Sequence, residues 1–371
     1  MLTMRIQQRK TAATLLASLL VLLSAVTASA QTTPPMDDAA HHALGWLRNQ
    51  TQPDGSFPGF GAGSTVDAVL AIAAAGHDPG TYNRGGKTPL EFLEANVADL
   101  TKSPGSAGKL LLAISALGRD PRSFGGVDLI DTVNASYDAS TGHYGQDVIG
   151  HAFVILGLRA SGAQVPANAL AFLDSTQTAE GGWAFSGDKS PGAADTNTTA
   201  VVIQAYVAAG AQDRAHQNVL RTAWTYLMSQ QNPDGGFPYQ KGGQGGSDSD
   251  VNSTAYAAQA LIALGGTEDA RKPLEFIVSL QKPSGAFQWM KSEPDDNPGA
   301  TYQAIPALLG ATLAAPAKGM TPVPGVSDPG VSVPGMPTTG SPVDDGMGVL
   351  VGIAALALGI GVLARRKAPA R

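Results

Sequence analysis

The sequence predicts an all-α fold in which about six tandem helix pairs form an inner and an outer layer. Three observations lead to this prediction: a short segment recurs along the chain, an alanine- and leucine-rich helix follows each copy, and each of these helices ends at a glycine. Such self-similarity is the sequence signature of repeat architectures. We expect the repeats to span residues 31–314.

The recurring segment is clearest in two copies. WLRNQTQPDGSF, which starts at Trp46, aligns without gaps on YLMSQQNPDGGF, which starts at Tyr226. A third copy starts at Phe172 and a fourth at Phe276. Two weaker copies fill the interval between the first copy and the third, so six units result.

The second helix of each unit is apolar nearly all round, whereas the first keeps a polar face, as in residues 43–50. A helix that is apolar on every side must be buried between layers, and an amphipathic helix covers it from outside. Such units close into an α/α-toroid or stack as an open solenoid. We favour closure because six units close the known toroids. A glycine just past each inner helix is the expected left-handed stop: Gly76, Gly118, Gly162, Gly210, Gly265 and Gly310.

Residues 1–30 have the features of an export signal. Basic residues at positions 5, 9 and 10 precede an apolar run over 15–26, and Ala28-Ser29-Ala30 supplies the small-x-small pattern that a signal peptidase needs. The mature chain is then expected to start at Gln31. An uncleaved membrane anchor is the alternative.

The C-terminal region has the features of a membrane anchor. Residues 347–364 are an unbroken run of apolar residues and glycines, just long enough to span a bilayer, and the tail 365–371 opens with Arg365-Arg366-Lys367 and would stay in the cytoplasm. The pentapeptide MPTTG at 336–340 resembles the LPxTG signal of sortase substrates, with Met336 in place of Leu. This resemblance implies cleavage after Thr339 and attachment to the cell envelope; a plain transmembrane anchor explains the helix equally well.

Composition narrows the possible functions. Residues 315–346 are rich in proline, glycine and small polar residues, so we expect a spacer between toroid and anchor. The chain has no cysteine, which excludes disulfides and thiolate metal sites. Its net charge is -6 and no basic cluster lies outside the termini, so nucleic acid is not an expected partner. The predicted location is the extracellular face, with the C-terminus as tether.

The turn between the two helices of a unit carries the motif Gln-x-x-x-Gly-x-aromatic. This motif resembles the QW motif (QxxxGxW) of squalene and oxidosqualene cyclases, and residues 36–314 resemble the terpenoid cyclase and protein prenyltransferase superfamily of α/α-toroids. The glycine allows a tight turn, the ring fills the seam between units and the glutamine bonds to backbone, so the motif is expected to be structural. Its residues are Gln177, Gly181, Trp183, Gln231, Gly235, Phe237, Gln281, Gly285 and Phe287.

A second register lies fifteen residues before four of the closing glycines, and each of its positions holds an aspartate: Asp147, Asp195, Asp250 and Asp295. Asparagine follows two residues later in three units: Asn197, Asn252 and Asn297. Asp and Asn directly before an apolar helix are good N-caps. The alternative is a polar rim at one mouth of the ring, where these residues and His151 would bind a ligand.

The resemblance to known enzymes fails at their catalytic positions. Class II terpenoid cyclases carry DxDDTA in this register, and the middle Asp donates a proton to the substrate. This chain has DTNTTA and DVNSTA, with Asn197 and Asn252 at the position of the acid, so cyclisation would require Asp195 or Asp250 to take over. The zinc site of the prenyltransferases needs Cys. Asp147 and His151 have the i, i+4 spacing of a metal pair, but an ordinary hydrogen-bonded pair is preferred.

Three functions stay open: a non-catalytic surface protein that binds a small molecule or a surface partner, a cyclase-type enzyme with an atypical acid, and a structural or adhesion module. We prefer the first. It has a precedent in cobalamin-binding proteins, whose large domain resembles this toroid, so a corrinoid is a candidate ligand and no other cofactor is implied. Few aromatic side chains on the inner helices argue against a chamber that stabilises carbocations: Phe153, Tyr206, Tyr256 and Tyr302.

Overall fold

The computed structural model describes residues 34–317 except 214 and 244–246. The described residues from Met36 on form one compact unit. The expected signal (1–30), the pentapeptide 336–340, the apolar helix 347–364 and the tail 365–371 lie outside the described residues, as does most of the spacer. None of the helices in the described part combines the length and apolarity needed to cross a bilayer.

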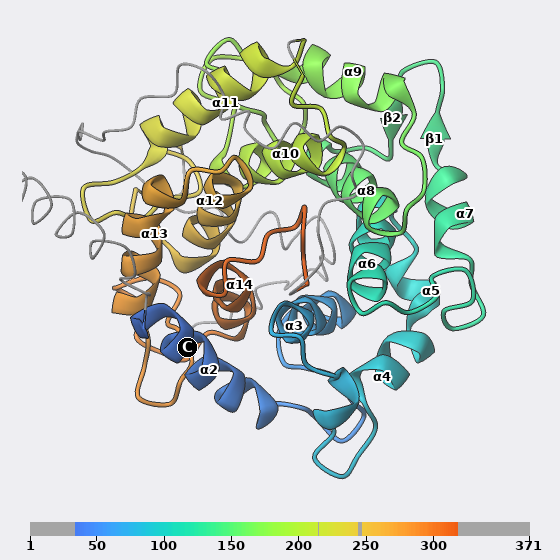
Figure 1. Ribbon diagram of the computed structural model, residues 1–371, viewed down its shortest axis with the longest axis vertical. Helices are drawn as coiled ribbons and strands as arrows, with labels where there is room; N and C mark the ends of the chain where they lie inside the picture. The colour runs from blue at the N-terminus through green and yellow to red at the C-terminus, as the bar shows by residue number, and fades with distance from the viewer. Residues whose placement is uncertain (1–33, 214, 244–246, 318–371) are drawn as a thin grey trace, which may run out of the picture. The chain divides into compact units, whose positions relative to one another are not determined.

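The described part of the chain forms thirteen α-helices in two concentric layers (Figure 1). The inner layer is α3 (Ala62–Ala74), α6 (Pro104–Ala116), α8 (Val148–Ala160), α10 (Thr196–Ala208), α12 (Val251–Ala263) and α14 (Pro298–Leu308). The outer layer is α2 (Pro34–Arg48), α4 (Pro89–Ala95), α5 (Val97–Leu100), α7 (Leu129–Asn134), α9 (Ala167–Thr176), α11 (Gln217–Gln230) and α13 (Thr267–Ser279). Each inner helix follows its outer partner in sequence, which confirms the all-α fold of six helix pairs.

Burial explains the composition of the inner helices. Every residue of α10 is buried, and so are eleven of the thirteen in α12. All six closing glycines have φ between 65° and 83°, a region that L side chains avoid. At the first of them, the His77 amide also bonds back to the carbonyl oxygen of Ile72 (3.1 Å), as in a Schellman stop. The predicted ends of the inner helices are therefore confirmed.

The outer layer is less regular in the two units where the repeat is weak. In the second unit, the Thr88 side chain and the Glu91 carboxylate form a capping box at the start of α4, which ends after seven residues. In the third unit, α7 is followed by the two-residue strands β1 (Tyr137–Asp138) and β2 (His143–Tyr144), which pair antiparallel with Tyr137 opposite Tyr144. A 3-10 turn, η1 (Pro79–Thr81), precedes α4.

The last unit bonds to the first, which closes the ring. Gln281 Nε2 donates to the Ala39 carbonyl oxygen (2.8 Å), and Trp46 Nε1 donates to Asp296 Oδ2 (3.2 Å). Between the layers, the Tyr302 hydroxyl donates to the Pro58 carbonyl oxygen (3.1 Å). Helices α14 and α3 are accordingly neighbours in the inner layer, as Figure 1 shows. The repeats thus form an α/α-toroid and not an open solenoid.

The QW-like turns hold each unit against the next. Gln177 Nε2 donates to its own turn at the Gly181 carbonyl oxygen (2.7 Å) and to the neighbouring helix α11 at the Val219 carbonyl oxygen (3.1 Å). Gly181 has a φ of 96°, and a Cβ there would meet the Thr222 carbonyl oxygen of α11 at 2.5 Å. The ring of Trp183 is fully buried. All three residues therefore have a structural role at this seam.

Candidate functional site

Three of the four aspartates of the second register cap inner helices. Asp147 Oδ1 accepts the Gly150 amide (2.6 Å), Asp195 Oδ1 accepts the Thr198 amide and Asp250 Oδ1 accepts the Ser253 amide (both 2.7 Å). Asp195 also accepts the Phe185 amide on its second oxygen (3.1 Å). Asp195 and Asp250 are buried, so both carboxyl groups lie within the joint between turn and helix.

The last unit departs from this register by two residues. There Asn297 is the N-cap of α14, with its Oδ1 accepting the Ala300 amide (2.8 Å), while Asp295 is exposed. The Asn297 amide donates to the Phe287 carbonyl oxygen (2.8 Å), just as the Asp195 amide donates to Trp183 (3.0 Å). The difference arises because α14 starts at Pro298 and has eleven residues. Helices α10 and α12 each have thirteen.

The residue four positions after each of these caps supports the preceding turn. In four units this residue is a threonine whose Oγ1 accepts the amide of the turn's aromatic residue. The pairs are Thr65 with Phe57, Thr199 with Trp183, Thr254 with Phe237, and Thr301 with Phe287, at 2.8 to 3.0 Å. The threonine of the DTNTTA and DVNSTA segments is therefore part of the scaffold.

His151 occupies this same position in the third unit. Its Nδ1 accepts the Tyr144 amide (3.0 Å), and its Nε2 lies 2.9 Å from the Ala169 carbonyl oxygen. Nδ1 must accept and Nε2 must donate, which fixes a neutral tautomer. The i, i+4 spacing of Asp147 and His151 is thus the spacing of cap and turn support. Within the described residues, no three His, Asp or Glu side chains meet as they would around a metal ion.

Burial perturbs the acid–base behaviour of these groups. Desolvation raises the pKa of Asp195 to about 6 and that of Asp250 to about 7, although the amide of Thr198 or Ser253 works in the opposite direction. Desolvation likewise lowers the pKa of His151 to about 4. Desolvation also raises the pKa of the partly buried Asp147. At neutral pH, His151 is therefore neutral and much of the Asp250 population carries a proton.

The two asparagines are the second residues of α10 and α12. Asn252 Nδ2 donates across the inner layer to Gln303 Oε1 on α14 (2.8 Å), and the Asn252 side chain is 7% exposed. Asn197 is 4% exposed and its Oδ1 is buried without a hydrogen-bond partner. The expected rim residues are therefore largely enclosed, and Asp295 stands apart from the others.

The centre of the ring is built from two layers of side chains, of which the sequence alone had drawn attention only to Phe153 and Tyr256. Helix geometry places the sixth and ninth residues of each inner helix on one face. The sixth-position layer comprises Asp67, Lys109, Phe153, Val201, Tyr256 and Gln303. The ninth-position layer comprises Leu70, Leu112, Leu156, Gln204, Gln259 and Pro306. Members of both layers line a central cavity.

An ion pair dominates the sixth-position layer. Lys109 Nζ lies 2.5 Å from Asp67 Oδ1 and 5.2 Å from the centre of the Phe153 ring. The Lys109 side chain is 13% exposed and that of Asp67 is 20% exposed. Desolvation lowers the pKa of Lys109, but Asp67 and Tyr256 together raise it above its ordinary value, so the ammonium stays charged. A signal for this pair was present, because each residue is a single charge inside an otherwise apolar helix.

A segment of the chain itself enters the centre of the ring. After α14 a turn runs back to the middle of the inner layer, where Figure 1 shows it within the ring, and Thr312 pairs with Ala315. The Leu313 amide donates to Gln204 Oε1 on α10 (2.7 Å), and Leu313 lines the central cavity. This central turn extends to Pro316, which is buried. The central cavity that Leu313 lines has a volume of about 20 Å³, which is room for about one water molecule.

Sequence and structural comparisons identify relatives of this ring. Residues 130–302 match the family model for the squalene-hopene cyclase C-terminal domain. Over 237 residues, or 62% of this chain, the sequence is 28% identical to drimenyl diphosphate synthase of Streptantibioticus cattleyicolor. The match covers 40% of that protein, so the chain spans well under half of its relative's length.

Solved structures share the fold at low sequence identity. The type II terpene cyclase MstE from Scytonema is 12% identical and superposes with a TM-score of 0.52 over 74% of this chain and 98% of its own. A glycosidase in complex with glucose is 13% identical, with a TM-score of 0.53 over 76% and 98%. These two proteins differ in chemistry, so the shared ring alone does not define an activity. The comparisons therefore show that residues 130–302 are similar to a squalene-hopene cyclase domain and that the ring as a whole shares its fold with terpene cyclases and glycosidases.

Proposed function

We propose that this protein is a non-catalytic member of the cyclase-like toroids, held at the cell surface, that binds a small molecule or a surface partner on its outside. The observation that carries the proposal is the filled centre of the ring. Where an isoprenoid chain would have to fold, the Asp67–Lys109 pair and the central turn occupy space, and the cavity that they line measures about 20 Å³. Ligand pockets usually measure about 300–1,000 Å³.

The absence of a positioned acid supports the same proposal. Asn197 and Asn252 stand where class II cyclases have the proton donor, and an amide does not supply a proton. Asp195 and Asp250 are engaged by backbone amides at the helix caps and are 1% and 2% exposed. Neither carboxyl group lines the central cavity.

Surface location is the second part of the proposal and rests on the sequence of the two ends. An export signal at 1–30, a spacer, the MPTTG pentapeptide and the apolar helix 347–364 would carry the toroid across the membrane and hold it there. Fractionation of cells that make the full chain, followed by mass spectrometry, tests this. We expect a mature N-terminus at Gln31 and protease access to the toroid on intact cells. Recovery of an intact Met1 from the cytosol would contradict it.

A cyclase-type enzyme is the second candidate, and similarity alone favours it. The relative is a drimenyl diphosphate synthase, and the family match is to a squalene-hopene cyclase domain. One property of the structure also fits: Asp250, with its pKa raised to about 7, holds a proton near neutral pH as a general acid must. In this candidate the central turn would have to leave the ring before a substrate could enter.

One set of assays separates the candidates. The purified full chain is incubated with squalene and with linear prenyl diphosphates, and products are analysed by gas chromatography. We expect no cyclic product. A cyclic product that disappears in Asp250→Asn or Asp195→Asn would establish the enzyme and refute the non-catalytic proposal. Titration with a corrinoid, followed by its absorbance, tests that ligand; the filled centre leads us to expect no encapsulated corrinoid.

A further inference from the structure

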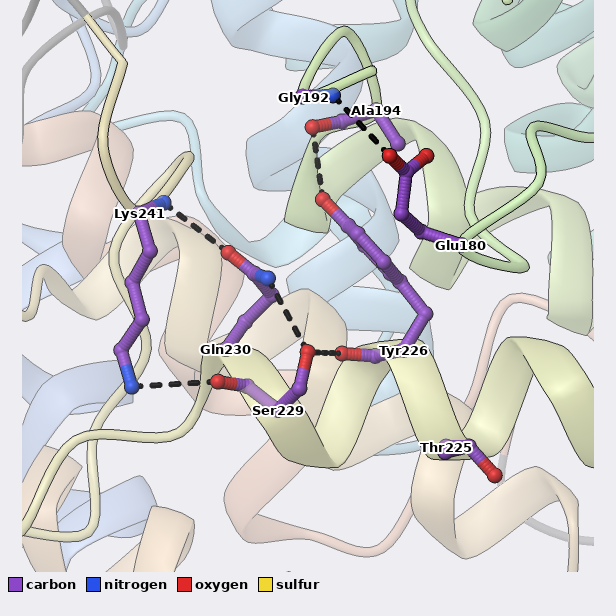
Figure 2. A pocket seen from close by; sticks show the side chains of 8 residues that line it. All are labelled: Glu180, Gly192, Ala194, Thr225, Tyr226, Ser229, Gln230 and Lys241. Atoms are coloured by element: carbon purple, nitrogen blue, oxygen red, sulfur yellow. Dashed lines mark hydrogen bonds between the residues drawn. The ribbon is translucent and has the colours of Figure 1, made fainter. Parts of the chain in front are cut away.

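A pocket of about 250 Å³ opens on the outside of the ring, at the seam between the fourth unit and the fifth. One wall is the turn of the fourth unit, with Glu180 and Ala194, and the other is the C-terminal end of α11 together with Lys241 (Figure 2). Neither the sequence motifs nor the cyclase resemblance assigns anything to it. A ligand for this pocket would make the proposed function more specific. The inference rests on that function in one respect, that the ring acts as a binding protein.

The next seam around the ring explains why space is left here. Its equivalent residues, Asp234 and Lys291, form an ion pair (Oδ2 to Nζ 3.4 Å), and Lys291 Nζ lies 5.7 Å from the centre of the Phe276 ring. Acid, base and aromatic ring therefore gather in one place there. At the pocket the aromatic residue is a tyrosine, and the acid and the base lie on opposite walls, as Figure 2 shows.

Hydrogen bonds hold both walls in place. The Tyr226 hydroxyl donates to the Ala194 carbonyl oxygen (2.6 Å), which ties α11 to the loop of the fourth unit. Lys241 Nζ donates to the Gln231 carbonyl oxygen (2.8 Å) and to that of Ser229 (3.2 Å), at the C-terminal end of α11. The lysine is thus oriented by a helix end, where a cation is favoured. The pocket is preformed, so little ordering is required on binding.

The groups on the walls both donate and accept. Glu180 Oε1 accepts the Gly192 amide (3.3 Å), which leaves the other carboxylate oxygen as an acceptor. Gln230 Oε1 accepts the Lys241 amide (3.0 Å), and its Nε2, with two protons, donates to Ser229 Oγ (3.2 Å). Fixed acceptors and donors within one small pocket suit ligand groups that also do both, which is the property of hydroxyl groups.

Charge and size narrow the ligand further. Glu180 repels an anion at one wall and Lys241 repels a cation at the other, so a ligand with a net charge of either sign is disfavoured. Charged groups on both walls disfavour an isoprenoid chain, and a volume of about 250 Å³ is below the usual range for drug-sized ligands. We infer that this seam pocket binds one neutral sugar ring, as a free monosaccharide or as a residue of a glycan.

Saturation-transfer NMR on the full chain tests the inference, with the methyl glycosides of glucose, galactose, mannose and N-acetylglucosamine as probes. We expect transfer to at least one of them, with a dissociation constant of roughly millimolar size for a single open pocket. Glu180→Gln should weaken that binding about five- to tenfold, because it removes the charge from an accepting oxygen. The matched control is Asp234→Asn at the neighbouring seam, which should leave binding unchanged.

Three results would overturn the inference. These are no transfer to any of the glycosides, equal binding by the Glu180→Gln variant and the unsubstituted chain, and tighter binding of glucuronate or glucosamine than of the neutral sugars. Both substituted positions are in surface turns, and a urea denaturation curve checks that each variant is folded. Failure of the proposed function has a different signature: a cyclic terpenoid product would refute the non-catalytic role and leave sugar binding at the seam unaffected.

Discussion

At the scale of single residues, one position in five of the six repeats decides how a turn is held. Threonine at the fourth residue after the cap accepts the turn's amide in four units, and His151 does so in the third unit with a ring nitrogen. A hydroxyl accepts at any pH. An imidazole accepts only while it is neutral, so this unit acquires a pH dependence that the threonine units lack.

We expect the contribution of His151 to the free energy of unfolding, taken as the difference between the unsubstituted chain and His151→Asn, to fall as the pH drops from about 6.5 towards 4. His151 has its pKa lowered to about 4 in the folded state, so over this range the unfolded chain binds the proton and the folded chain does not. The full shift corresponds to roughly 3 kcal/mol. Urea denaturation at a series of pH values measures it. In His151→Asn, which keeps an acceptor and a donor, this part of the pH dependence should vanish, whereas His143→Gln should retain it.

A buried aspartate changes stability with pH in the opposite direction to His151. The pKa of Asp250 is raised to about 7, so the folded chain keeps a proton that the unfolded chain releases near pH 3.8, and stability is lost as the pH rises between these values. Asn297 performs the same capping role without a charge. Asp250→Asn should therefore become more stable than the unsubstituted chain as pH increases, by up to about 4 kcal/mol above pH 7. An equal difference at pH 4 and pH 8 would disprove this account.

At the scale of elements, the turn glycines fix the spacing between units. Gly285 has a φ of 96°, and a Cβ at this position would meet the His42 carbonyl oxygen of α2 at 2.5 Å. Gly310 has a φ of 69° but no atom within 4 Å of such a Cβ. The two positions therefore separate backbone strain from the closeness of the neighbouring unit.

Substitution by alanine should distinguish the two effects. Gly310→Ala should cost about 1 kcal/mol for the left-handed backbone alone. Gly285→Ala should cost about 2–4 kcal/mol, because α2 must also move away from the last unit. Urea denaturation gives both values, and limited proteolysis should detect release of α2 only in Gly285→Ala. Equal costs would show that the seam tolerates displacement.

The elements that could be predicted are those specified by local sequence. Apolar runs and closing glycines define the inner helices without help from the rest of the chain. The cap register failed in the last unit because Pro298 starts α14 two residues later than counting from Gly310 implies. The central turn was not foreseen, since the segment Ala311-Thr312-Leu313 is short and its position depends on a partner, Gln204, more than a hundred residues away.

At the scale of the whole molecule, charge is concentrated at one point of the ring's centre. Helices α3 and α6 contribute Asp67 and Lys109, two neighbours in an otherwise mostly apolar interior. A mostly buried ion pair adds little net stability compared with apolar side chains, but removal of one partner leaves a charge that water cannot fully solvate.

Lys109→Met should lower the free energy of unfolding by about 3–5 kcal/mol. The double variant Lys109→Met with Asp67→Leu should recover most of this loss, because no charge remains. Denaturation of the unsubstituted chain, the two single variants and the double variant gives the coupling energy between Asp67 and Lys109. The exposed pair Lys102–Asp99, with a similar distance of 2.5 Å, is the control, and Lys102→Met should change stability by about 1 kcal/mol or less. A double variant as unstable as the single one would contradict the account.

The closure of the ring through Gln281 and Ala39 constrains how such a protein can evolve. In an open solenoid a repeat can be duplicated or deleted and the ends remain free. In this ring each unit occupies about one sixth of the circle, so the gain or loss of one unit would leave a gap or an overlap at the seam where α14 meets α3. Variation should therefore accumulate within units, as in the shortened outer helices of the second and third, while the number of units stays fixed.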